Sequence, residues 1–125
     1  MNCLQVVPML LTRVIEAQQN DQYCQNMKYY LSSRQEAEDW SLSTEGYLKY
    51  KGKIFVPDVD EIREEVLREF HHSRFAVHPG GTKMYKDLGR QYWWSGMKKS
   101  VAEFVSRCLT CQQVKAEHQR PAGLL

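Results

Sequence analysis

The sequence predicts an α+β protein in which small N-terminal helices and an antiparallel β-meander precede a bundle of three helices. Two helical patterns and three β-rich runs separated by glycines predict the first unit, residues 1–57. Three further segments with apolar residues at helical spacing predict the second unit, residues 58–115. Residues 116–125 are polar and then small, which is typical of a linker.

The first unit is expected to begin with an extended or irregular segment over residues 1–11. Thr12 is expected to cap a short helix that runs to Asn20, and Asp21 to cap a second one. Apolar residues of the second helix recur at helical spacing and predict one buried face: Tyr23, Cys24, Met27, Tyr30 and Leu31. Cys24 is therefore expected to be a small buried apolar residue.

A polar connector over residues 32–39 leads into the predicted meander. Three short runs have β-rich composition: residues 40–43, 47–50 and 53–56. Gly46 and Gly52 suit the tight turns between them, and Pro57 ends the last run.

The first helix of the second unit is expected to start at Asp58, because Asp58-x-x-Glu61 resembles a capping box, and to end near residues 71–73. Its apolar stripe is Ile62, Val66, Leu67 and Phe70. A second helix is expected over residues 82–90, with three side chains facing inward: Met84, Tyr85 and Leu88.

Ser95 is expected to cap the third helix, which has the most regular pattern of the chain. Its apolar residues follow the spacing i, i+4, i+7, i+8 and i+11: Met97, Val101, Phe104, Val105 and Cys108. Before it lies an aromatic cluster, Tyr92, Trp93 and Trp94. These rings can stack on nucleic-acid bases, but packing between the last two helices explains at least one tryptophan more simply.

Three short helices bury a small core, and domains of this size commonly need a disulfide, a metal or a partner. Four potential ligands are spaced His-x6-His, then 29 residues, then Cys-x2-Cys: His71, His78, Cys108 and Cys111. Two imidazoles and two thiolates fill the tetrahedral shell of one structural Zn²⁺ ion and leave no position for a substrate. The adjacent His72 gives His-x5-His, so spacing alone leaves the first ligand open.

Charge is distributed unevenly along the chain. Residues 1–57 carry six basic and six acidic side chains, whereas residues 71–125 carry nine basic and three acidic ones. A basic module suggests a polyanionic partner, although a solvated surface explains each cation singly. The cations that could contact phosphates are Lys83, Lys86, Arg90, Lys98, Lys99, Arg107, Lys115 and Arg120. The predicted DNA contacts among them are Lys83, Lys86, Arg90, Lys98, Lys99 and Lys115.

Several function classes find no support in the sequence. The chain has no P-loop, dinucleotide-binding fingerprint or Ser/His/Asp arrangement, so neither catalysis nor a small-molecule substrate is expected. The longest apolar stretch, residues 4–11, is far shorter than the roughly 20 residues that span a bilayer, which predicts a soluble intracellular protein without a membrane partner. A thiol redox enzyme that uses Cys108 and Cys111 is disfavoured, because such pairs usually accompany a βαβ pattern.

Four segments, residues 71–80, 82–85, 92–99 and 108–115, together resemble the His-His-Cys-Cys zinc-binding domain of retroviral and gypsy-type LTR-retrotransposon integrases. Residues 40–56 are similar to the extension that precedes this domain, and residues 116–125 to the linker that follows it. Ser95 and Gly81 depart from the family pattern, which commonly has proline and a larger residue there.

The resemblance implies a zinc-stapled three-helix bundle and selects the four ligands: His71, His78, Cys108 and Cys111. It also implies contacts with the DNA ends of the element and with other integrase protomers, and a nuclear location. Integration chemistry belongs to a downstream catalytic core, so the chain is not expected to be an enzyme alone. The alternative is a stand-alone or domesticated zinc module that binds protein and no DNA.

Overall fold

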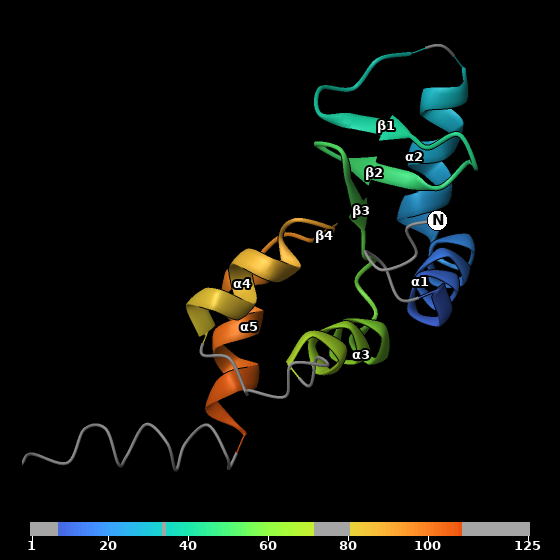
Figure 1. The fold of residues 1–125 in the computed structure, drawn as a ribbon. Coiled ribbons are helices and arrows are strands. Elements are labelled where there is room, and N and C mark those ends of the chain that lie inside the picture. The colour runs from blue at the N-terminus through green and yellow to red at the C-terminus, as the bar shows by residue number, and fades with distance from the viewer. Residues whose placement is uncertain (1–7, 34, 72–80, 109–125) are drawn as a thin grey trace, which may run out of the picture.

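The computed structural model describes residues 8–33, 35–71 and 81–108 (Figure 1). The elements follow the order α1 (Pro8–Gln19), α2 (Gln22–Ser32), β1 (Trp40–Leu42), β2 (Leu48–Tyr50), β3 (Lys53–Phe55), α3 (Asp60–His71), α4 (Gly81–Leu88), β4 (Tyr92–Trp93) and α5 (Met97–Ser106). The predicted mixture of helices and a sheet is therefore confirmed. The zinc-stapled bundle stays a prediction, because His78 and Cys111 lie outside the described residues.

Helix α1 begins at Pro8, so the prediction of an extended or irregular segment was wrong for residues 8–11, as was the predicted cap at Thr12; residues 1–7 lie outside the described part of the chain. Proline fits the first turn of a helix because the N–H that it lacks has no intrahelical partner there. The additional turn carries Leu10, which is buried together with Val14, four residues later on the same face. Burial of this apolar pair accounts for the earlier start.

Helix α2 begins as predicted, after Asp21. The Asp21 carboxylate accepts a hydrogen bond of 3.0 Å from the backbone N–H of Cys24. Cys24 is fully buried, as expected, but Tyr30 is 44% exposed and Tyr23 is 52% exposed. The buried face of α2 is therefore narrower than the spacing of its apolar residues indicates.

Strands β1, β2 and β3 form the predicted antiparallel meander, with Gly46 and Gly52 at positive φ in its turns. A fourth strand, β4, was not predicted; it pairs in parallel with β3, with Ile54 opposite Tyr92. The N–H of Val56 donates to the carbonyl of Trp93 at 3.0 Å in this pairing. The sheet is thus mixed, and its order β1-β2-β3-β4 joins the two predicted units.

Gln18 of α1 is buried and fastens this helix to the sheet. Its Nε2 donates to the carbonyls of Leu48 at 3.0 Å and Phe55 at 2.7 Å. Its Oε1 accepts the N–H of Leu48 at 2.8 Å. One side-chain amide therefore satisfies three backbone groups on β2 and β3.

Replacing Gln18 with leucine is expected to lower the free energy of unfolding by about 1–3 kcal/mol, because buried backbone groups lose their partner. Urea unfolding followed by circular dichroism measures this loss. Gln19→Leu is the matched control, since Gln19 is exposed on the same helix and its replacement should cost less than about 0.5 kcal/mol. Equal effects of both changes would contradict a role for the Gln18 hydrogen bonds.

Two predicted helix starts were wrong. Helix α3 begins at Asp60, and the Asp58 carboxylate accepts a hydrogen bond from Arg63 Nη1 at 3.2 Å instead of capping the helix. Helix α5 begins at Met97, and its cap residue is Gly96 with φ of 82°, a conformation that glycine adopts without a steric penalty. Ser95 therefore makes no cap.

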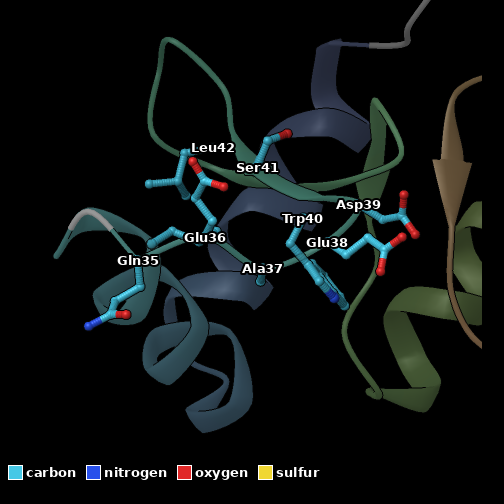
Figure 2. A pocket seen from close by; sticks show the side chains of 9 residues that line it. Gln35, Glu36, Ala37, Glu38, Asp39, Trp40, Ser41 and Leu42 are labelled. Carbon is cyan, nitrogen blue, oxygen red and sulfur yellow. The ribbon is translucent and has the colours of Figure 1, made fainter.

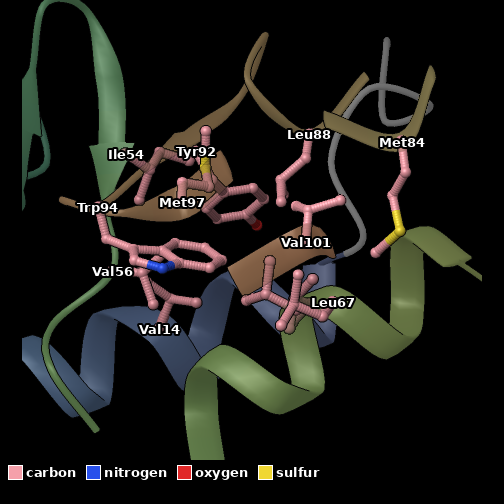
Figure 3. Close-up of a cluster of buried hydrophobic side chains, with 12 residues drawn as sticks. Val14, Ile54, Val56, Leu67, Met84, Leu88, Tyr92, Trp94, Met97 and Val101 are labelled. Atoms are coloured by element: carbon pink, nitrogen blue, oxygen red, sulfur yellow. The ribbon is translucent and has the colours of Figure 1, made fainter. Parts of the chain in front are cut away.

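The inward stripes predicted for α3, α4 and α5 are confirmed (Figure 3). One buried cluster takes side chains from three helices and from α1, β3 and β4: Leu10, Val14, Ile54, Val56, Val66, Leu67, Met84, Leu88, Tyr92, Trp94, Met97 and Val101. A smaller cluster lies between α2 and the sheet and contains Cys24, Leu48 and Phe55. Residues on both sides of the predicted boundary at residue 57 therefore share one core.

Within the described part of the chain, none of the helices has the length and apolar character needed to cross a membrane.

Candidate functional site

His71 is the last described residue of α3 and lies inside the protein. Only 1% of its surface is exposed, and its ring meets the ring of Phe104 on α5 edge-on, with centroids 5.3 Å apart. The position follows from the helical pattern, because His71 lies one turn after the buried Leu67. The apolar stripe of α3 therefore aims this imidazole at α5.

Cys108 lies just beyond α5. Its backbone N–H donates to the carbonyl of Val105 at 3.1 Å, which extends the last turn of the helix. Cys108 follows Phe104 by four residues, which is about one helical turn. Phe104 is the residue of α5 whose ring contacts His71. Of the four predicted zinc ligands, His71 thus contacts α5 through Phe104, and Cys108 follows directly after the end of α5.

The other predicted ligands, His78 and Cys111, lie outside the described residues, and so does the alternative ligand His72. Among residues 8–33, 35–71 and 81–108, no group of three or more potential metal-binding side chains is found. The buried imidazole at the end of α3 and the thiol just after α5 supply one nitrogen and one sulfur of the N₂S₂ donor set that Zn²⁺ binds in tetrahedral structural sites.

Cys24 is not part of this site. It packs against Leu48 and Phe55, and burial raises the pKa of its thiol to about 12, with a further contribution from the Asp21 carboxylate. The expected role of Cys24 as a small buried apolar residue is confirmed.

Alkylation of Cys24 at pH 8 is expected to be at least about 100-fold slower in the native protein than in denaturant, because the thiolate is the nucleophile. Peptide mass spectrometry after iodoacetamide treatment separates Cys24 from the other cysteines. Since the folded pKa lies above the unfolded value of 9.0, the stability that the neutral thiol contributes is lost as the pH rises from 9 toward 12. Equal alkylation rates in both states would contradict the burial of this thiol.

The predicted DNA contacts lie on α4, after it, and at the start of α5. Asp87 accepts from Lys83 Nζ and from Arg90 Nη1, each at 3.2 Å. Lys98 Nζ lies 6.0 Å from the ring centroid of Tyr85. Lys86 and Lys99 are exposed, and Lys115 lies outside the described residues. The predicted DNA contacts that the structure describes thus lie on, or just after, the neighbouring helices α4 and α5.

The aromatic cluster belongs mainly to the core. Tyr92 and Trp94 are fully buried, and Trp93 is stacked on Tyr50 of β2 with centroids 4.0 Å apart. The expectation of core packing is therefore confirmed, and Tyr92 and Trp94 cannot stack on bases.

Charge of the opposite sign gathers at the other edge of the sheet. Figure 2 shows a hollow over β1 and the connector before it, whose lining includes Glu36, Glu38 and Asp39. Strands β1 and β4 are the two edges of the sheet, so the acidic and basic regions are separated by its width. Of these two edges in the described part of the chain, the β4 edge has the charge that suits a polyanion.

The second predicted unit is similar to a known protein family. The family described as the integrase zinc binding domain matches residues 59–117. Residues 59–117, slightly less than half of the chain, are therefore similar to this family. The resemblance seen in the sequence is confirmed over that range, which includes all four predicted ligands and the described helices α3, α4 and α5.

Similar proteins are retrotransposon polyproteins. The Transposon Tf2-3, Tf2-4 and Tf2-5 polyproteins of Schizosaccharomyces pombe (strain 972 / ATCC 24843) are each 28% identical to the chain over 75 residues. This alignment covers 60% of the chain and 6% of each polyprotein, so the chain spans a small part of these relatives. No solved structure gives a significant match.

The family match supports zinc as the cofactor of the integrase zinc-binding domain, a domain that is not itself catalytic. The number of ions and the identity of the ligands stay predictions. Sequence reasoning missed Lys53 of β3, which joins Lys86 and Arg90 in lining a hollow beside β4. Only the unpredicted pairing of β3 with β4 brings Lys53 to this surface.

Proposed function

We propose that the chain is the N-terminal region of a retrotransposon integrase, in which one structural zinc ion fixes α3 against α5. The ligands would be His71, His78, Cys108 and Cys111. The observation that carries the proposal is the family match over residues 59–117, within which His71 is buried against Phe104 of α5. Bound zinc would cross-link the chain. It would supply no reaction chemistry, because four protein ligands complete its tetrahedral coordination and leave no position for a substrate.

The proposed role of this region is to bind the DNA ends of the element and other integrase protomers in the nucleus. Exposed cations on α4 and α5 support the DNA contact, because Lys and Arg side chains bind phosphates irrespective of sequence. Phosphate contacts position a protein on DNA and leave base recognition to other groups. We therefore expect weak sequence preference from this region alone.

Fluorescence anisotropy with a labelled DNA duplex, measured across a salt series, tests the proposal on the zinc-loaded chain. The logarithm of affinity should fall with the logarithm of salt with a slope of about −0.9 for each phosphate contacted. Removal of zinc should abolish binding if the metal holds the basic helices in place. Affinity that does not change with salt, or no binding at low salt, would contradict the DNA role.

A second candidate is the protein-binding module without DNA affinity. The observation in its favour is the set of exposed apolar side chains on α1 and α2, namely Met9, Tyr23, Tyr29 and Tyr30. Tyrosine and methionine are enriched at protein interfaces. Sedimentation of the chain over a concentration range, with and without DNA, separates the two candidates, since this one predicts self-association or partner binding that DNA does not affect.

A further inference from the structure

A hollow lies where β3, β4, α4 and α5 adjoin, and neither His71 nor Cys108 is part of its described lining. Its described lining combines three cations with aromatic and apolar side chains and includes no acidic residue: Lys53, Tyr85, Lys86, Gly89, Arg90, Trp93 and Met97. Lys53 begins β3 in the N-terminal unit, whereas Lys86 lies on α4 and Arg90 just after it. The pairing of β3 with β4 therefore builds the hollow from both predicted units.

The cations of this hollow are only partly neutralised. Asp87 is shared between Lys83 and Arg90, so one carboxylate balances two positive charges. Within the described part of the chain, neither Lys53 nor Lys86 forms an ion pair. Two ammonium groups thus remain available to an anion.

The apolar part of the lining strengthens this attraction. Trp93 is stacked on Tyr50, and Met97 is 5% exposed, so both are held in place by the core. Charges beside fixed apolar groups are screened less by water than charges on an open surface.

We infer that Lys53 and Lys86, with Arg90, bind neighbouring backbone phosphates of a nucleic-acid strand in this hollow. The inference rests on the proposed DNA binding and deepens it, because it adds the N-terminal sheet to the contact surface. A polymer is favoured over a free anion because further cations follow at spaced positions. Lys98 lies over Tyr85, a lining residue, and Lys99 is exposed next to it on α5.

The double variant Lys53→Gln/Lys86→Gln tests the inference in the zinc-loaded full chain. The control Lys28→Gln/Arg68→Gln removes the same net charge from α2 and α3, outside the hollow. Circular dichroism should show that both variants fold. With a labelled duplex, the salt slope of the double variant should be smaller than that of the wild type by about 0.9 for each lysine, or about 1.8 in total. Its affinity deficit should therefore shrink by about tenfold over a fourfold rise in salt.

Each outcome has one meaning. Wild-type protein that does not bind the duplex overturns the proposed DNA role and this inference with it. Wild-type binding with equal slopes for the double variant and its control overturns the hollow alone. A second arm titrates the wild type and the double variant with inorganic phosphate at constant ionic strength. Phosphate that binds the wild type but not the double variant, together with equal salt slopes for the duplex, would assign the hollow to a free anion and overturn the strand assignment. A smaller duplex slope for the double variant than for its control supports the strand.

Discussion

Removal of zinc is expected to unfold α3, α4 and α5. Structural zinc in small domains carries roughly 10–16 kcal/mol of apparent binding free energy, which equals or exceeds the whole stability of most domains. His71 and Cys108 lie on α3 and just after α5, so loss of the ion would release these two helices from each other. Most of the helical signal of residues 58–115 should disappear when a chelator is added.

The N-terminal sheet should be affected less. Cys24, Leu48 and Phe55 form their own cluster with α2, and Gln18 ties α1 to β2 and β3. Helix α1 would still lose part of its cover, since its buried leucine and valine belong to the cluster shared with α3 and α5. A second, smaller unfolding step of residues 8–56 is the expected sign of this partial independence.

Single substitutions locate the ligands. His71→Ala, His78→Ala and Cys108→Ser should each lose zinc and melt at a much lower temperature, whereas His72→Ala is the matched control and should keep both. Elemental mass spectrometry gives the zinc content, and thermal circular dichroism gives the melting temperature. A His71→Ala protein that keeps one zinc ion and the wild-type melting temperature would contradict its assignment as a ligand.

The helices that could be predicted are those with an apolar stripe. In α3 and α5 the buried residues recur at helical spacing, and their inward faces were identified correctly. The starts were less predictable, because a cap depends on the backbone of one residue and on competing partners. The Asp58 carboxylate accepts a hydrogen bond from Arg63 and does not cap α3. The cap position of α5 has a left-handed backbone, which Gly96 adopts, so the cap is Gly96 and not Ser95.

Strand β4 could not be predicted because two residues contain no periodicity. Its pairing with β3 joins residues that are almost 40 positions apart, as with Ile54 and Tyr92, and only tertiary packing brings them together. The same pairing brings Lys53 and Lys86 to the lining of one hollow. The distribution of charge along the sequence had assigned these two lysines to separate units. The zinc ligands, in contrast, stay a prediction that rests on residue type and spacing, with His71 preferred to His72 through the family resemblance.

Replacing Trp94 with alanine is expected to lower the free energy of unfolding of the zinc-loaded protein by about 3–5 kcal/mol, the usual cost of emptying a large core site. Trp94 is fully buried in the shared cluster (Figure 3). Its Nε1–H donates to Ser100 Oγ at 3.1 Å, and the guanidinium of Arg63 lies 5.4 Å from its ring centroid. One side chain therefore links the end of β4 to α5 and α3.

Two further variants separate the contribution of apolar packing at Trp94 from that of its hydrogen bond. Urea unfolding measures the free energy of unfolding of each variant. Trp94→Phe keeps most of the apolar ring and removes the donor, so its cost should be well below that of alanine. Ser100→Ala removes only the acceptor and should cost about 1 kcal/mol, the usual net value of one hydrogen bond. If Trp94→Ala costs no more than Ser100→Ala, packing at this position contributes little. The apolar contact between the two predicted units would then depend on α1 and β3 instead.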